Sequence, residues 1–147
     1  MATEPATETP RLRAFREGHM AFVEAFNRGD FEAAFAGLRD DFVLHFPLGF
    51  PVKELHGREK VIAFYRELRE DLDDWRLQPR EYFQTGPRTF VIGLENEGVG
   101  RTSGLPAVAW VWDVLELDED DRPVRADEFF DRSEAFQAAG IEEPEAR

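Results

Sequence analysis

Two strand-like runs between residues 106 and 131 each place one carboxyl group among apolar side chains. Side chains alternate between the two faces of a strand, and Asp113 is the one charged residue on a face that otherwise holds Ala, Val and Leu. In the second run Glu128 shares its face with Val124, Ala126 and Phe130. An unpaired carboxyl is costly to bury, so this hairpin predicts either a structural ion pair or the floor of a functional site.

The turn at residues 118–123 sets the expected register of the hairpin. If the two strands pair symmetrically about it, Glu128 lies at the level of Asp113. Two carboxyls in one dry pocket cannot both ionise cheaply, so one becomes an acid and the other a base. The alternative is structural, with Asp113 held by a backbone N–H and Glu128 paired with Arg76 or Arg101.

The rest of the chain supplies helices first and then strands. Apolar periodicity predicts helices over residues 11–27, 31–38, 58–72 and 133–139, and strands over 42–46, 75–85 and 89–99. Segment 48–57 holds Pro51 and two glycines and is predicted to be a loop. Pro79 suggests an edge strand or a bulge. Helices that precede an antiparallel meander indicate an α+β fold, in which a bent sheet can enclose a cavity.

Composition excludes several classes of function. A chain of 147 residues suits one domain, which we place at residues 11–141 between a disordered leader (1–10) and an acidic tail (142–147). The net charge of −13 disfavours nucleic acids and anionic membranes as partners. The absence of Cys, of a secretory signal and of a long apolar run leads us to expect a cytoplasmic protein.

Three segments resemble a known family: AFNRGDFEAAFAGLRDDFVLHFP, HGREKVIAFYREL and VRADEFFDRSEAFQAAGI. Together with GVGRTSG they look like the SnoaL-like branch of the nuclear-transport-factor-2-like superfamily, over roughly residues 11–141. The resemblance implies a cone-shaped, strongly bent antiparallel sheet that is closed by the N-terminal helices around a pocket. It also implies a small-molecule ligand and, in many members, a homodimer formed through the convex face of the sheet.

Ketosteroid isomerases of this superfamily use a Tyr on the first helix, an Asp on the first strand and an Asp on the penultimate strand. The matching positions here are Phe22, Phe46 and Asp113. Only the last position keeps the acid, so the resemblance supports the pocket more strongly than steroid isomerisation.

Two other branches suggest further residues. In limonene-epoxide-type hydrolases, the catalytic carboxylate of the final strand corresponds to Glu128, and the earlier polar pair falls near Glu95 and Glu97. SnoaL-type cyclases move a proton with an Asp/His pair, and a similar group here would contain His45, Asp113 and Glu128. These three are our candidate catalytic residues.

The remaining candidates concern the pocket wall and the outer surface. We expect Tyr65, Trp75 and Phe130 to line the pocket together with Phe22, Phe46, Glu95 and Glu97. The apolar face that carries Trp110 and Trp112 is expected to form the dimer interface. No metal-ligand spacing or phosphate loop is present in the sequence, so we expect neither a metal nor a cofactor.

Three functions fit these features. The first is a cofactor-independent acid/base enzyme of isomerase, cyclase, dehydratase or hydrolase type, with Glu128 as base, Asp113 as acid and His45 as shuttle. The second is a binding or accessory protein with the same cavity and no turnover. The third is a structural dimer with a filled core.

Overall fold

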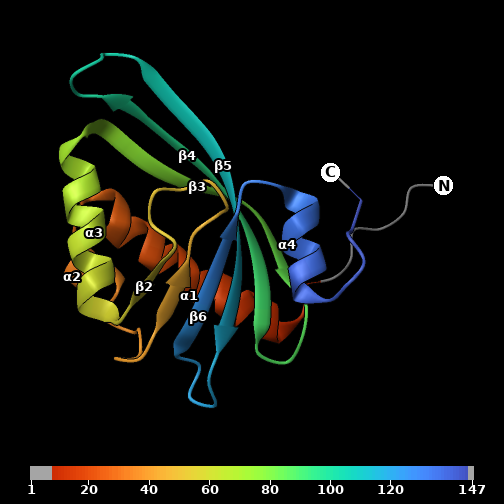
Figure 1. The fold of residues 1–147 in the computed structure, drawn as a ribbon. Helices are drawn as coiled ribbons and strands as arrows, with labels where there is room; N and C mark the ends of the chain where they lie inside the picture. The colour runs from red at the N-terminus through yellow and green to blue at the C-terminus, as the bar shows by residue number, and fades with distance from the viewer. Residues whose placement is uncertain (1–7, 146–147) are drawn as a thin grey trace.

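The computed structural model describes residues 8–145, which form four helices and six strands (Figure 1). In chain order the elements are α1 (Pro10–Asn27), α2 (Phe31–Ala34), β1 (Val43–His45), β2 (Glu54–His56), α3 (Arg58–Glu70), β3 (Leu72–Gln84), β4 (Thr89–Gly100), β5 (Pro106–Leu117), β6 (Pro123–Phe129) and α4 (Arg132–Ala139). Most of the expected leader, and the last two residues of the expected tail, lie outside the described residues. No helix in the described part of the chain combines the length and hydrophobicity that a membrane span requires.

Local signals set the helix ends. The Thr9 hydroxyl accepts a hydrogen bond from Leu12 N–H at 3.1 Å, and Pro10 occupies the first turn, where its missing N–H costs nothing. Asp131 caps α4 in the same way, and Gly140 ends that helix in the left-handed conformation at φ 77°. The predicted helices are therefore present, although α2 has only four residues.

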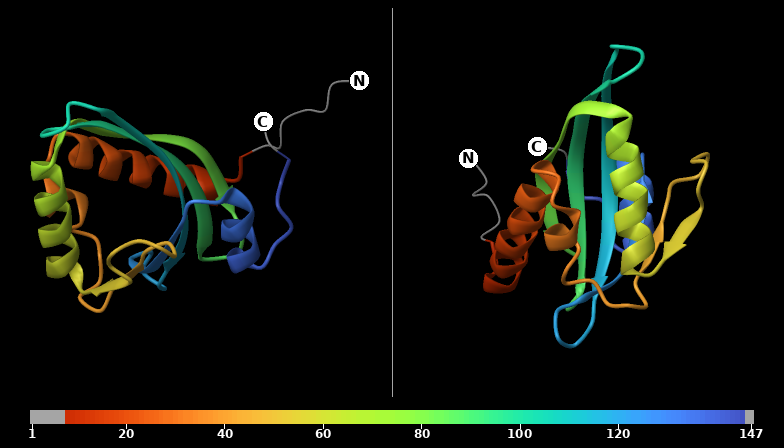
Figure 2. Two further views of the ribbon diagram at one scale, coloured as in Figure 1. Left: turned by 45° about the horizontal axis from the view of Figure 1, so that its top comes forward. Right: turned by 90° about the vertical axis from the view of Figure 1, so that its left-hand side faces the viewer.

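The sheet has the strand order β2-β1-β6-β5-β4-β3 and is curled without closing into a barrel (Figure 2). This confirms the α+β class and the bent sheet. One pair differs from the wholly antiparallel sheet that we expected, because β1 runs parallel to β6. The edge strand β3 has register shifts at Asp73/Arg76 and at Pro79/Glu81, and such bulges increase the bend of a strand.

Different helices cover the two faces of the curled sheet. Helices α1 and α3 lie inside the curve and α4 lies outside it (Figure 2). On the inside, Phe15 of α1 stacks on Phe90 of β4 with ring centroids 3.9 Å apart. On the outside, Trp112 is buried beneath Ala135 and Phe136 of α4.

This outer cover corrects part of the expected tryptophan face. Trp112 is only 6% exposed, because α4 of the same chain already packs on it and the Arg132 guanidinium lies 5.4 Å from its ring. Trp110 and Val108 remain 43% and 61% exposed. Of the expected interface, the part around Val108 and Trp110 is therefore available to a second chain, and the part around Trp112 is not.

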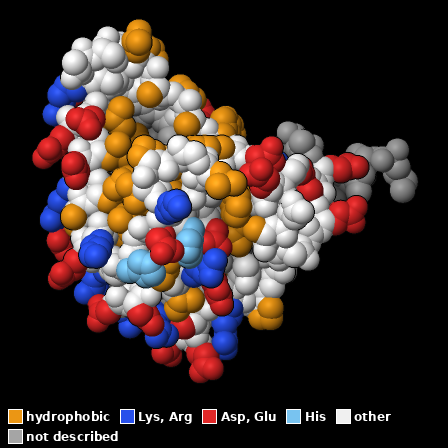
Figure 3. All heavy atoms as spheres, in the orientation of Figure 1, with side chains coloured by type: hydrophobic (Ala, Val, Ile, Leu, Met, Phe, Trp, Pro, Cys, Tyr) orange, Lys and Arg blue, Asp and Glu red, His pale blue; other side chains and the backbone are white. Residues whose placement is uncertain are grey.

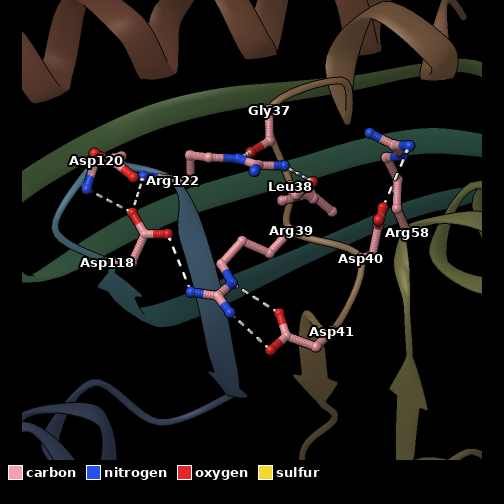
Figure 4. Close-up of polar contacts among 9 residues, drawn as sticks. All are labelled: Gly37, Leu38, Arg39, Asp40, Asp41, Arg58, Asp118, Asp120 and Arg122. Atoms are coloured by element: carbon pink, nitrogen blue, oxygen red, sulfur yellow. Dashed lines mark hydrogen bonds and ion pairs between the residues drawn. The ribbon is translucent and has the colours of Figure 1, made fainter.

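The turn between β5 and β6 is anchored to the rest of the molecule rather than being a free, solvated tip (Figure 4). Asp118 Oδ1 accepts hydrogen bonds from the backbone N–H groups of Asp120 and Arg122 at 2.8 and 2.9 Å. Its other oxygen receives Arg39 Nη1 at 3.3 Å, and Arg39 also makes a two-point contact with Asp41. These contacts hold the β5–β6 turn against the segment that precedes β1.

Candidate functional site

The site is built on the pairing of β5 with β6. Asp113 is directly opposite Glu128 in the antiparallel ladder, which confirms the symmetrical register predicted from the sequence. Directly opposed residues have Cβ atoms about 5 Å apart and point to the same side of the sheet. Both carboxyls lie on the inner side and line a cavity of about 490 Å³.

Aromatic and aliphatic side chains form most of the cavity wall. The aromatic members come from α1, the segment after β1, α3, β3 and the residue after β6: Phe22, Phe26, Phe46, Phe50, Phe64, Tyr65, Trp75 and Phe130. Figure 3 shows hydrophobic side chains gathered around a hollow between α3 and the β4–β5 hairpin. A volume of this size suits a small organic ligand.

Tyr65 connects α3 to the carboxyl pair. Its hydroxyl donates a hydrogen bond to Glu128 Oε1 at 3.3 Å. Burial raises the pKa of Tyr65 well above its usual value, and the nearby carboxyls of Glu128 and Asp113 raise it further. The phenol is therefore a neutral hydrogen-bond donor at physiological pH.

Burial also controls the two carboxyls. It raises the pKa of Glu128 to about 7, although the hydrogen bond from Tyr65 acts in the opposite direction because it favours the charged form. Burial raises the pKa of Asp113 well above its usual value, and the negative charges of Glu128 and Asp127 add to this effect. Near neutral pH the pair therefore retains a proton, with Asp113 as its main holder.

One atom of the pair has no partner. Asp113 Oδ1 is buried and makes no hydrogen bond in the described structure. The structural alternatives from the sequence are not realised: among residues 8–145 Glu128 makes no ion pair, and Arg101 instead bonds Asp73 at 3.0 Å. A buried polar atom without a partner in a cavity wall is available to a ligand.

The structure brings most of the predicted site residues together. The cavity is lined by Phe22, Phe46, Tyr65, Trp75, Glu97, Asp113, Glu128 and Phe130. Glu95 is not among the lining residues, because it is opposite Trp110 on the outer face of the sheet, where its carboxylate pairs with Arg80 at 2.9 Å.

His45 is separated from the carboxyl pair by the sheet itself. In the parallel pairing of β1 with β6, Leu44 is opposite Ala126 on the buried side and His45 is opposite Asp127 on the other side. The His45 ring nitrogens lie 2.8 Å from Asp127 and 2.9 Å from Glu54. The expected group of His45, Asp113 and Glu128 is therefore not formed.

The sequence analysis missed one polar residue of the cavity. Asn96 lines it and accepts a hydrogen bond from Trp75 Nε1 at 3.3 Å. A signal was present, because Asn96 falls on the same alternating face of β4 as Ile92 and Leu94 and is the one polar side chain there.

Comparisons with known proteins agree with this geometry. A family model described as SnoaL-like domain matches residues 20–126. A search of curated proteins found no match.

Solved structures with similar folds share little sequence with the chain. An NTF2-like protein of unknown function from Burkholderia pseudomallei is 24% identical with a TM-score of 0.68, covering 86% of this chain and 97% of that one. A ketosteroid isomerase-like protein from Erwinia carotovora is 22% identical with a TM-score of 0.61, covering 82% and 96%. An epoxide hydrolase of LEH-like type from M. tuberculosis is 19% identical with a TM-score of 0.65, covering 88% and 92%. At these identities the likeness establishes the fold alone.

Proposed function

The chain belongs to the SnoaL-like domain family, and on this premise we propose that it is a cofactor-independent acid/base catalyst acting on an apolar, oxygen-bearing small molecule. The observation that carries the proposal is the opposed Asp113–Glu128 pair at the wall of a largely apolar cavity. Structural relatives named ketosteroid isomerase-like protein and epoxide hydrolase support a reaction governed by proton transfer.

The environment of each carboxyl assigns its role. Glu128 receives the Tyr65 hydrogen bond, which favours its carboxylate form, so we assign it as the base. Asp113 keeps its proton, so we assign it as the acid that donates to a substrate oxygen. His45 has no part in this proposal because its ring lies on the opposite face of the sheet.

The proposed reaction conserves protons within the pair. Glu128 removes a proton from a carbon atom near the oxygen function, while Asp113 gives its proton to the substrate oxygen. If the C–O bond remains, the enol is isomerised when Glu128 returns its proton to a different carbon and Asp113 takes back the proton of the oxygen. If the C–O bond breaks, the protonated oxygen leaves as water or an alcohol. The Phe and Trp walls exclude water from both transfers.

Proton exchange with solvent tests the proposal. We would incubate the protein with a panel of apolar ketones, enones and epoxides in D₂O and detect incorporated deuterium or new products by mass spectrometry. We expect label or product with at least one class, and a loss of 100-fold or more in Glu128→Gln and Asp113→Asn. Ligands that bind without label or product in the wild type would instead identify a binding protein that uses the same cavity.

We further propose that the protein is a homodimer formed through the outer sheet face. The support is the exposed apolar surface of Val108 and Trp110, which α4 leaves uncovered. Light scattering should give twice the mass of one chain for the wild type and a smaller mass for Trp110→Glu. A monomeric wild type at 100 µM would contradict the dimer.

A further inference from the structure

The cavity concentrates acidic groups without a basic partner. Among the described residues that line it, the ionisable ones are Tyr65, Glu97, Asp113 and Glu128, and none is Lys, Arg or His. Elsewhere in residues 8–145 many carboxylates have arginine partners, such as Glu95 with Arg80. The positive charge that this cavity lacks could come from a ligand.

The walls would suit a cation as well as an apolar body. The ring of Phe26 packs edge to face with those of Tyr65 and Trp75, and the three rings together form part of the cavity wall. The faces of aromatic rings attract an ammonium group, most strongly where water is excluded. Asp113 Oδ1, buried and without a partner, is a free acceptor for an N–H group.

We propose that the cavity is a receptor for lipophilic amines, which it binds as ammonium cations between the Asp113–Glu128 pair and the aromatic walls. A neutral amine that enters takes the proton of the pair: an N–H bond forms, the carboxylic O–H bond breaks, and no other reactant is needed. The ammonium ion holds both carboxyls in the charged form, so it stops the proton transfer proposed above. The inference shares with that function only the use of this cavity as the ligand site.

Binding is then coupled to pH. Tyr65 of α3 faces the pair from the cavity side and stays neutral. Asp127 of β6 lies on the other face of the sheet, beside His45 and Arg125, and its negative charge acts on Asp113 across the sheet. A permanent cation must displace the proton that the pair holds at neutral pH, so its affinity rises with pH across the titration of Glu128. A neutral ligand displaces no proton, and its affinity does not rise.

A charge series tests the inference on the intact protein. The probes are benzyltrimethylammonium, a permanent cation, its neutral isostere neopentylbenzene, and the anion 3-phenylpropanoate, followed by tryptophan fluorescence because Trp75 lines the cavity. At pH 8 we expect the cation to bind at least tenfold more tightly than the isostere, and the anion not to bind. Between pH 5.5 and 8 the dissociation constant of the cation should fall at least tenfold, with proton release visible by calorimetry in two buffers.

Matched variants separate the cavity from the net charge of the molecule. Glu128→Gln should abolish the preference for the cation while preserving the affinity for neopentylbenzene. Glu119→Gln removes the same charge from the exposed hairpin turn and should leave both affinities unchanged. Equal affinities for cation and isostere at pH 8, equal effects of the two variants, or no binding of the cation at 5 mM would each overturn the inference. Absence of turnover would overturn the catalytic proposal and leave this result unaffected.

Discussion

At the scale of single residues, the opposed pair of Asp113 and Glu128 dominates the chemistry of the molecule. The two side chains come from adjacent strands and meet in a cavity wall that offers them Tyr65 and no cation. A carboxyl in such a place keeps its proton to a higher pH than in water. The same desolvation that makes the pair reactive therefore also makes it unfavourable for stability at high pH.

The free energy of unfolding should fall as pH rises from the ordinary pKa of Glu128 to its raised pKa in the native protein. Its pKa is 4.5 in the unfolded chain and about 7 in the native protein, so the native state binds more protons between these values and the free energy of unfolding decreases there. At about 1.4 kcal/mol per pKa unit Glu128 accounts for a loss of about 3 kcal/mol, and the raised pKa of Asp113 adds to the loss as pH rises further. Urea denaturation at pH 5 and pH 8 measures it.

The Glu128→Gln variant should lose at least half of this pH dependence. Glu119→Gln, in the exposed turn, serves as the control and should keep the wild-type curve. A wild-type protein that is more stable at pH 8 than at pH 5 would show that the pair is ionised and compensated in the native state.

Removing the phenol of Tyr65 should make Glu128 a poorer base at low pH. In Tyr65→Phe the hydrogen bond that favours the carboxylate is lost, so the pKa of Glu128 rises and the acid limb of the pH–rate profile moves to higher pH. The value of kcat/KM at pH 6 should fall up to about tenfold, because a hydrogen bond to a charged group is worth about 1.5 kcal/mol or more. Tyr82→Phe, which removes a hydroxyl that contacts His19 rather than the pair, should leave the profile in place.

The position of His45 shows a limit of reasoning from residue types. Leu44 of the same strand lies on the buried side opposite Ala126, so alternation places His45 on the other side, opposite Asp127. Alternation gave the correct face for Asp113 and Glu128, whereas the grouping with His45 came from family resemblance. Strand period is the more reliable guide to orientation.

At the scale of elements, the contact between β4 and β5 depends on a missing side chain. Gly93 is paired with Trp112, and a Cβ at Gly93 would overlap the indole ring. The glycine therefore lets the indole lie flat on the neighbouring strand, where α4 covers it. A larger residue at position 93 would clash with the indole ring of Trp112.

Gly93→Ala should destabilise the protein by about 1–3 kcal/mol, the usual cost of overpacking a core. Gly18→Ala is the control, because Gly18 lies in α1 with no atom within 4 Å of an added Cβ. That variant should gain about 0.5–1 kcal/mol from helix propensity. Thermal unfolding of both variants measures the difference, and equal stabilities would contradict the described packing of Trp112.

Long elements with clear periodicity were predictable from sequence, and short ones were not. The register of the 106–131 hairpin followed from its turn, and β3 and β4 followed from their period. The three-residue strand β2 has the sequence Glu-Leu-His and lies between Pro51 and Gly57, where the composition favours a loop. It is a strand because β1 supplies its hydrogen bonds, which is a tertiary effect.

At the scale of the whole molecule, the curled sheet separates two environments. Its inner side holds the cavity, and its outer side is covered by α4 near Trp112 and open near Trp110. Sequence pattern showed that both sides of β5 are apolar, and it could not show which helix would cover which side. The docking of α4 depends on contacts far apart in the chain, such as Arg132 with Glu81 at 3.2 Å.

The central claim is that Asp113 and Glu128 hold a shared proton at neutral pH in a ligand cavity. A carbon-detected NMR titration of the side-chain carboxyls from pH 3 to 9 tests it directly, with Glu128→Gln and Asp113→Asn to assign the two signals. We expect Glu128 to titrate near pH 7 and Asp113 to keep its proton well above the usual range of an Asp. Two carboxyls that are both ionised by pH 5 would contradict it.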